Sequence, residues 1–190
     1  MKSLFLALAI VAVSALTACS KTETPPTATA PAPQTYDLVA ANAKGFTVGA
    51  LMSVNTVYVL FDPQCPHCGH LWAAAQPLLN KAKFVWIPVA ILNGNSVPQG
   101  ATLLGASNPV DAMNLHEASL LAGTGGTVPS TSTPVDLEAA IKKNTELFTS
   151  LKLESVPFLV AHNAKTGQVV SNSGAMDTAS LAQLLGLNAN

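Results

Sequence analysis

The chain has 190 residues, a formal net charge of −1 and 10% charged residues, and its nine basic residues are all lysines. These lysines form no basic patch of the kind that binds a phosphate backbone, so the composition argues against nucleic-acid binding. The segment 36–190 is long enough to form one domain with a sizeable core.

The N-terminus is predicted to be an export signal. Lys2 precedes an apolar run from Leu4 to Leu16, which is shorter than the ~20 residues that span a bilayer. The run ends in Leu16-Thr-Ala-Cys19, which resembles the lipobox of bacterial lipoproteins. That resemblance implies a signal peptide at residues 1–18 and lipid attachment at Cys19, and an ordinary secretory signal is the alternative. We therefore expect a protein that is lipid-anchored in the bacterial cell envelope and faces the periplasm.

Residues 19–35 are predicted to be a disordered tether, because they hold four prolines and many threonines and alanines. Such a composition cannot bury enough apolar surface to fold. If Cys19 carries lipid, Cys65 and Cys68 are the two cysteines left to react with each other. An exported chain meets an oxidising compartment, in which a disulfide between them can persist.

The most informative motif is Cys65-Pro-His-Cys68, which follows an apolar, β-rich run at 56–61 and precedes a helix-like stretch. A strand that leads into a CxxC at a helix N-terminus is the thioredoxin-type redox arrangement. The helix N-terminus favours a thiolate, so we expect the pKa of Cys65 to lie below the free value of about 8.5. Pro66 suits the first helical turn, and His67 brings a donor or a positive charge to the Cys65 sulfur. Both residues tune the pair toward an oxidising disulfide, and Cys68 is the expected resolving thiol.

Other interpretations of the pair stay open. A zinc site needs four ligands, and His67 and His70 lie near enough in sequence to join the cysteines, although such tight spacing rarely surrounds one ion. Thiolates also suit a carrier of Cu(I) or Zn(II). Two further alternatives are an inert structural disulfide and a peptide-binding chaperone module in which the pair is incidental. Asp62 is either a turn residue or a proton acceptor for Cys68. We expect no metal, and no cofactor other than the redox-active disulfide Cys65–Cys68.

The remaining elements follow from periodicity and turn residues. His116 and Glu117 lack the second histidine of a zinc-protease motif and are predicted to be a pair on a helix surface. Thr133 is expected to cap a helix whose first residue is Pro134. The block at about 94–152 is predicted to be a helical insertion. The predicted elements are a hairpin of strands 46–48 and 56–61, a helix 65–81 kinked at Pro77, a buried strand 83–92, flexible stretches 93–109 and 123–134 around a helix 109–121, a hairpin of strands 158–161 and 168–171, and a last helix from Asp177 to Gly186.

The stretches FDPQCPHCGHLWAAAQPLL and SVPFLVAHNAKTGQV, with the insertion between them, resemble the catalytic domain of the DsbC/DsbG group of bacterial envelope thiol–disulfide oxidoreductases. The resemblance covers roughly residues 45–187. It implies an α/β, thioredoxin-like fold for residues 36–190, with the helical insertion between the CxxC-bearing βαβ unit and a cis-proline hairpin. It also implies that Val156-Pro157 is a cis peptide facing the CxxC, and that Val156 and Pro157 bind an extended substrate through the backbone.

The resemblance further implies catalytic roles for Cys65 and Cys68 and, as partners, exported proteins with thiols or disulfides and a membrane redox protein. The CPHC centre with Val156 before the proline also resembles DsbA, a dithiol oxidase, which favours an oxidising character. The DsbC/DsbG proteins carry an N-terminal dimerisation domain, whereas only the signal, the tether and a short segment precede the first catalytic strand here. We therefore expect a monomer that does not act as an isomerase by that route.

Overall fold

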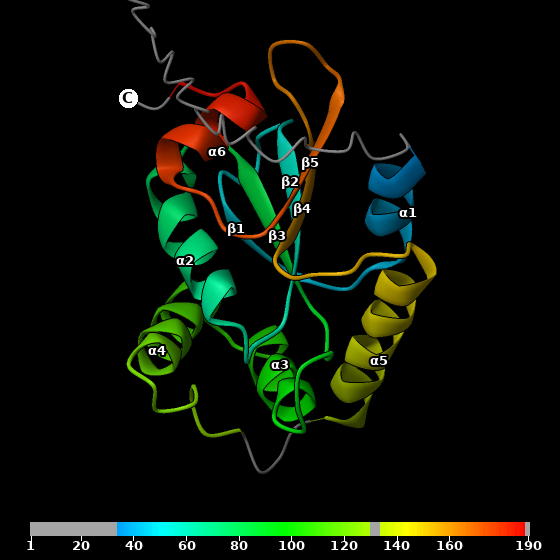
Figure 1. Ribbon diagram of the computed structural model, residues 1–190, viewed down its shortest axis with the longest axis vertical. Coiled ribbons are helices and arrows are strands. Elements are labelled where there is room, and N and C mark those ends of the chain that lie inside the picture. The colour runs from blue at the N-terminus through cyan, green and yellow to red at the C-terminus, as the bar shows by residue number, and fades with distance from the viewer. Residues whose placement is uncertain (1–33, 130–133, 189–190) are drawn as a thin grey trace, which may run out of the picture.

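The computed structural model describes residues 34–129 and 134–188 (Figure 1). The predicted signal, the lipid site Cys19 and the tether up to residue 33 lie outside the described residues. The tether was predicted to continue to residue 35, and that boundary is wrong because helix α1 begins at Gln34 and runs to Asn42. This helix is held on the domain by Val39, which is fully buried, and by Tyr36, whose ring meets Tyr58 edge-on.

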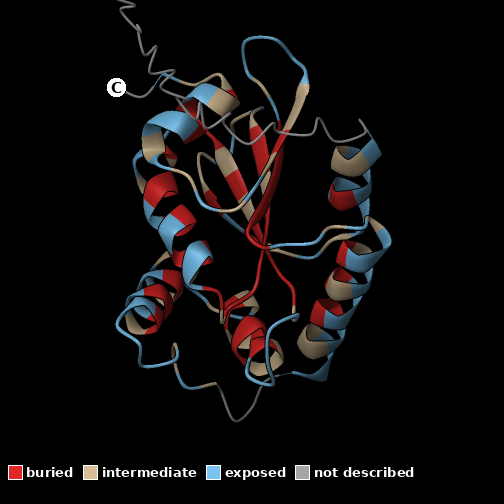
Figure 2. Cartoon of the chain, in the orientation of Figure 1, coloured by how far each residue is buried: buried red, intermediate tan, exposed pale blue. Residues whose placement is uncertain are grey.

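A five-stranded sheet forms the centre of the domain. Its strands lie in the order β1-β3-β2-β4-β5, and β2 and β3 are parallel while the other neighbouring pairs are antiparallel. Figure 2 shows buried residues along the central strands and on the helix faces that cover them. The largest buried side chains in the sheet are Phe61, Phe84 and Trp86. The strands are β1 Phe46–Gly49, β2 Thr56–Phe61, β3 Lys83–Pro88, β4 Phe158–His162 and β5 Val169–Ser173.

The predicted hairpin between 46–48 and 56–61 is wrong, because β1 pairs with β3 and not with β2. Gly49 has φ 91°, and a Cβ on it would lie 2.6 Å from the backbone oxygen of Ala82. The chain therefore turns tightly against the start of β3, and Ala50 N–H donates to the Ala82 oxygen (3.1 Å). The following loop then carries the chain to the far side of β3, where β2 begins.

Helix α2 spans Pro66–Ala75 and continues as a 3₁₀ turn, η1, at Gln76–Leu78. A single kinked helix to residue 81 was predicted, and the structure shortens it because Pro77 has no N–H for the α-helical ladder. Strand β3 ends at Pro88, not at residue 92 as predicted. The N–H groups of Ile91 and Leu92 donate to the Asp62 carboxylate, so they are not available for a strand ladder.

The helical insertion lies between β3 and β4 as predicted, and it contains α3 Ser96–Leu104, α4 Pro109–Leu121 and α5 Val135–Ser150. The flexible stretch predicted at 93–109 is wrong, because α3 buries Ala101 and Leu103 against the domain. Pro134 occupies the N-cap of α5 and is not its first helical residue, and the predicted cap Thr133 lies outside the described residues.

The C-terminal hairpin and helix follow the prediction. Strands β4 and β5 are antiparallel partners. Helix α6, Thr178–Leu185, begins after Asp177, whose side chain caps the Ser180 N–H, and it ends at Gly186 in the left-handed region. Helices α2, α4 and α6 lie on one side of the sheet and α1 and α5 on the other, while α3 lies beyond the end of the sheet at which β2 leads into α2 (Figure 1). Among the described residues no helix combines the length and the apolar character needed to cross a bilayer.

Candidate active site

Cys65 lies at the junction of β2 and α2, as the motif predicted. It is the N-cap of α2 with extended backbone angles (φ −99°, ψ 109°), and its N–H donates to the Asp62 carbonyl oxygen at 3.0 Å. The Cys68 N–H donates to the Cys65 carbonyl oxygen at 2.9 Å, so the first helical turn closes on the pair. Both thiols are free and buried, and Cys65 keeps 5% of its surface exposed while Cys68 keeps none. Of the two residues, only Cys65 therefore reaches the protein surface.

The two thiols have opposite acidities. The hydrogen bond from the Cys68 side chain, the backbone N–H groups of Cys68 and His67 and the charge of His67 lower the pKa of Cys65 to about 6, although burial opposes them. Burial, followed by the hydrogen bond and charge of Cys65, raises the pKa of Cys68 well above its ordinary value. At neutral pH Cys65 is therefore mostly the nucleophilic thiolate, and Cys68 holds its proton.

The peptide bond between Val156 and Pro157 is cis, as the resemblance implied. The Val156 carbonyl oxygen lies 3.6 Å from the Cys65 sulfur, across a sequence separation of 91 residues, and accepts a hydrogen bond from it when the thiol is protonated. Strand β4 starts at the next residue, Phe158, and pairs with β2. The sheet thus holds the backbone of Val156 beside the reactive sulfur. Binding of substrate by Val156 and Pro157 stays a prediction.

Asp62 is fully buried three residues before Cys65, the N-cap of α2, and its carboxylate accepts four hydrogen bonds. The donors are Gln64 N–H (2.8 Å), the Ser96 hydroxyl (2.7 Å), Ile91 N–H (2.7 Å) and Leu92 N–H (3.0 Å). These bonds occupy both oxygens and fix the segment between β3 and α3 over the active-site loop. Of the two roles considered for Asp62, they favour the turn residue.

A polar network joins the loop before Cys65 to the insertion. The Gln64 amide donates to the Gln99 side-chain oxygen and to the Gly125 carbonyl (2.9 Å), and the Asn93 amide donates to Gln64 (3.0 Å). Gln99 in turn donates to the carbonyls of Gly125 (2.8 Å) and Thr127 (3.0 Å). The sequence did not predict this network, because glutamine and asparagine side chains in loops are usually exposed to solvent.

His116 and Glu117 were predicted to lie on a helix surface, and that prediction is wrong because α4 turns both side chains into the protein, where they are 0% and 2% exposed. His116 Nε2 lies 2.7 Å from the Pro63 carbonyl, and its Nδ1 accepts the Thr127 N–H (3.2 Å). Burial lowers the pKa of His116, so the ring is neutral and donates from Nε2. The missed signal was helical spacing: Met113, His116, Glu117 and Leu120 form one buried stripe.

Glu117 lies against α2 at Gly69, the residue after Cys68. Burial, and then the charge of Cys65, raises the pKa of Glu117 to about 8. Trp72 on α2 donates its indole N–H to the Asn114 side chain at 2.8 Å, which ties the two helices together at this place.

The side chains considered for a metal site do not come together. His67 and His70 are exposed, with ring centroids 6.0 Å apart. Within residues 34–129 and 134–188, no group of three or more histidine, cysteine or acidic side chains is arranged to hold a metal ion.

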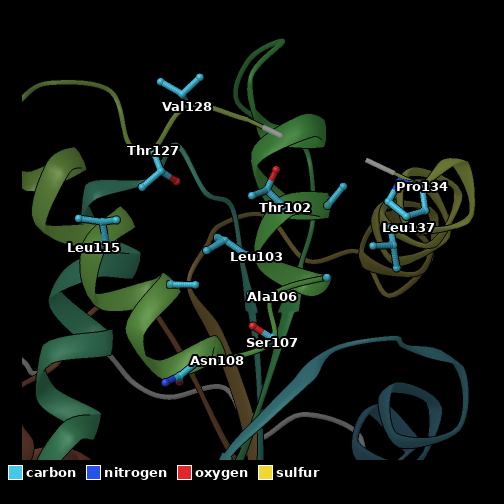
Figure 3. A pocket seen from close by; sticks show the side chains of 13 residues that line it. Thr102, Leu103, Ala106, Ser107, Asn108, Leu115, Thr127, Val128, Pro134 and Leu137 are labelled. Carbon is cyan, nitrogen blue, oxygen red and sulfur yellow. The ribbon is translucent and has the colours of Figure 1, made fainter. Parts of the chain in front are cut away.

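A cavity of about 520 Å³ lies within the insertion, away from the cysteines. Figure 3 shows Thr102 and Leu103 of α3 on one side of it and Leu115 and Thr127 on the other. Its described lining contains no ionisable side chain. It therefore offers shape and apolar surface but no group for acid–base or redox chemistry.

The chain was compared with known proteins, and no family model matches it. Over 133 residues, which are 68% of the chain, it is 31% identical to the thiol:disulfide interchange protein DsbG of Pseudomonas aeruginosa. The chain is a DsbG-like protein. The match spans 50% of that relative, so the DsbG-like chain corresponds to about half of its length.

Solved structures agree on the fold of this DsbG-like protein. The catalytic domain of Proteus mirabilis ScsC superposes with a TM-score of 0.63 at 15% identity, covering 80% of this chain and 93% of that domain. A periplasmic thioredoxin-like protein from Salmonella enterica serovar Typhimurium gives 0.60 at 15% identity, covering 82% and 95%. Helicobacter pylori DsbG gives 0.53 at 18% identity, covering 67% and 60%. These likenesses confirm the predicted α/β, thioredoxin-like fold.

Proposed function

We propose that this protein is a thiol–disulfide oxidoreductase that exchanges disulfides with protein substrates through Cys65 and Cys68. The observation that carries the proposal is the opposite acidity of two neighbouring thiols: the pKa of Cys65 is lowered to about 6, and that of Cys68 is raised. A structural disulfide or an inert thiol pair does not require this difference in pKa between its two cysteines. The name of the DsbG relative, a thiol:disulfide interchange protein, supports the same activity.

Oxidation of a substrate proceeds in two exchanges. A substrate thiolate attacks Cys65 Sγ in the Cys65–Cys68 disulfide, so that a mixed disulfide forms and Cys68 leaves with the electron pair. A second substrate thiolate then attacks the substrate sulfur of the mixed disulfide and releases Cys65 as a thiolate. Two electrons pass from the substrate dithiol to the cysteine pair, and we propose no further cofactor. A low pKa makes Cys65 a good leaving group, which favours this oxidising direction.

The surface around Cys65 supports an unfolded polypeptide as substrate. Ile91 and Leu92, which are 39% and 50% exposed, lie on the segment that Asp62 anchors, and Leu121 is 44% exposed beside Gly69. They place exposed apolar side chains on the segment bonded to Asp62, ahead of Cys65, and beside Gly69, the residue after Cys68. The Val156 backbone beside the sulfur supports pairing with an extended chain, in which main-chain hydrogen bonds tolerate many sequences.

The test is single-turnover oxidation of a reduced two-cysteine peptide by the oxidised protein. We expect oxidation by the wild type, none by Cys65→Ser, and an accumulated mixed disulfide when Cys68→Ser is incubated with an oxidised peptide. Equal oxidation by wild type and Cys65→Ser would contradict the proposal. The oxidising character has its own measurement, since a reduction potential above about −200 mV against glutathione supports it and a value near that of thioredoxin, about −270 mV, does not.

We further propose that the protein acts in the bacterial envelope, anchored through lipid on Cys19, as a monomer that a membrane redox partner recharges. The description of the Salmonella structure as periplasmic supports this location. Labelling cells with a radioactive fatty acid tests the anchor: label should enter the wild type and be lost in Cys19→Ala. Label retained in Cys19→Ala would refute the anchor and leave the redox activity untouched.

A further inference from the structure

Glu117 is a buried carboxyl group for which nothing in the redox scheme above has a use. It is 2% exposed, and neither of its oxygens has a hydrogen-bond partner among the described residues. A buried carboxyl normally finds a partner, because desolvation without compensation is unfavourable. Asp62, the other buried acid near the cysteines, accepts four hydrogen bonds. The lone pairs of Glu117 are thus available, and those of Asp62 are not.

The carboxyl of Glu117 is aimed at the active-site helix. Its Oε2 lies 2.6 Å from the place where a Cβ on Gly69 would stand, so only glycine at that position allows this approach. Gly69 directly follows Cys68 in the first turns of α2. The ionised carboxyl helps to raise the pKa of Cys68, and the Cys65 thiolate helps to raise the pKa of Glu117. The three groups therefore form one electrostatic cluster inside the protein.

No other ionisable side chain of the elements around α4 faces this cluster with a free acceptor. From α2 the buried titratable groups are Cys65 and Cys68, whereas His67 and His70 are exposed. Helix α3 and strand β1 contain no ionisable residue. On α4 itself Asp111 is exposed, and His116 is engaged with Pro63 and Thr127.

We propose that Glu117 exchanges the proton of Cys68 during disulfide exchange, an inference that rests on the function proposed above. When a substrate thiolate attacks Cys65, the Cys65–Cys68 bond breaks, and the departing Cys68 sulfur takes the proton of the Glu117 carboxyl through one bridging water, because no hydrogen bond joins the two groups directly. In the reverse direction Cys68 gives its proton to the Glu117 carboxylate and attacks Cys65 Sγ, and the substrate sulfur leaves with its electron pair. Glu117 then regains or loses its proton by exchange with solvent.

The acidity of the site suits this exchange. In the reduced protein the pKa of Glu117 is raised to about 8, so the carboxyl is mostly protonated at neutral pH and still ionises within the working range. In the oxidised protein burial, the larger cause, still raises this pKa, whereas the charge of Cys65 is absent. Proton transfer is most effective when the pKa of the donor lies near the operating pH. Without a donor, the breaking bond would leave Cys68 as a thiolate in a buried place that strongly disfavours its charge.

The experiment compares wild type, Glu117→Gln, Glu117→Asp and, as a matched control, Glu146→Gln, which removes an exposed carboxyl on α5. Oxidised protein is mixed with dithiothreitol between pH 5 and pH 9, and the single-turnover rate is divided by the thiolate concentration of the reagent. We expect the normalised rate of the wild type to decline toward pH 9 as the donor ionises, with a midpoint below pH ~8 because the disulfide removes the charge of Cys65. Glu117→Gln should be slower by about tenfold or more at pH 6–7 and lack that decline. Glu146→Gln should match the wild type.

A wild-type rate and pH profile in Glu117→Gln would overturn the inference. Glu117→Asp keeps a carboxyl, so a pH-dependent decline that returns in it supports a proton role, and a pH-independent slow rate in it overturns that role in favour of packing. The far-ultraviolet spectrum and the urea midpoint of each variant establish that it is folded. If the wild type itself shows no Cys65-dependent reaction, the proposed function fails. If it reacts and Glu117→Gln reacts identically, only the inference fails.

Discussion

The hydrogen bond from Cys68 is the leading cause of the low pKa of Cys65, and a pair of substitutions can isolate it. Cys68→Ala removes the donor, whereas Cys68→Ser keeps a hydroxyl donor of similar size in the same place. A hydrogen bond to a charged group contributes about 1.5–3 kcal/mol. At about 1.4 kcal/mol per pKa unit, the loss should raise the pKa of Cys65 by about 1–2 units in Cys68→Ala. In Cys68→Ser we expect a change of less than about half a unit.

The assay follows the ultraviolet absorbance of the thiolate during a pH titration, which is simple here because each variant has one thiol in the described domain. The rate of alkylation by iodoacetamide over the same pH range gives an independent value. If the alanine and serine variants titrate alike near pH 6, the hydrogen bond is not the cause, and the helix N-terminus with its backbone N–H groups would account for the shift. If both titrate near the free value, the geometry of the whole turn depends on the Cys68 sulfur.

Three further predictions concern pH and the buried acid Asp62. The reduction potential of the cysteine pair should fall by about 59 mV per pH unit below pH ~6, where two protons accompany two electrons, and by about 30 mV per unit above it, where Cys65 stays ionised and one proton is taken up. Potentials measured against glutathione at several pH values test this change of slope. The pKa of Cys65 is depressed in the folded protein, so its thiolate stabilises the reduced protein fully above the unfolded pKa, and this stabilisation is lost as the pH falls through about 6. Relative to Cys65→Ser, the free energy of unfolding in urea should be higher by about 1.4 kcal/mol at pH 7 and by up to about 3 kcal/mol at pH 9. A difference that does not depend on pH would refute this linkage. Asp62→Ala should cost at least about 3 kcal/mol in urea unfolding, because it leaves three part-buried N–H donors and the buried Ser96 hydroxyl without their acceptor.

Local signals made the redox pair and the C-terminal hairpin predictable, whereas the cis peptide at Val156-Pro157 followed from the family resemblance alone. The strand before Cys65, the proline in the first helical turn and the cap at Asp177 are all decided by neighbouring residues. The order β1-β3-β2 was not predictable in this way, because a short loop can close a hairpin or cross a neighbouring strand, and packing decides between them. Helix α3 was missed because its sequence contains glycine, proline and asparagine neighbours, although Pro98 stands in its first turn, where proline is tolerated.

The buried stripe of α4 shows the harder limit. A charged side chain on a helix usually faces water, and this expectation placed Glu117 on the surface. Its burial depends on Gly69 of another helix, which leaves room for the carboxyl. No feature of α4 alone contains that information. Only the stripe shared with Met113 and Leu120 contradicts the surface prediction.

The two buried acids beside the cysteines differ in what they can do, and their partners explain the difference. The Asp62 carboxylate accepts the hydrogen bonds that hold the segment between β3 and α3, so it is part of the architecture. Glu117 has no such bonds to lose, and it can gain or release a proton without moving a neighbour. Hydrogen-bond partners therefore give Asp62 a structural role and leave the Glu117 carboxyl free to titrate. Glu117 is contributed by the helical insertion, so in the proposed mechanism the insertion supplies a proton donor to the cysteine pair.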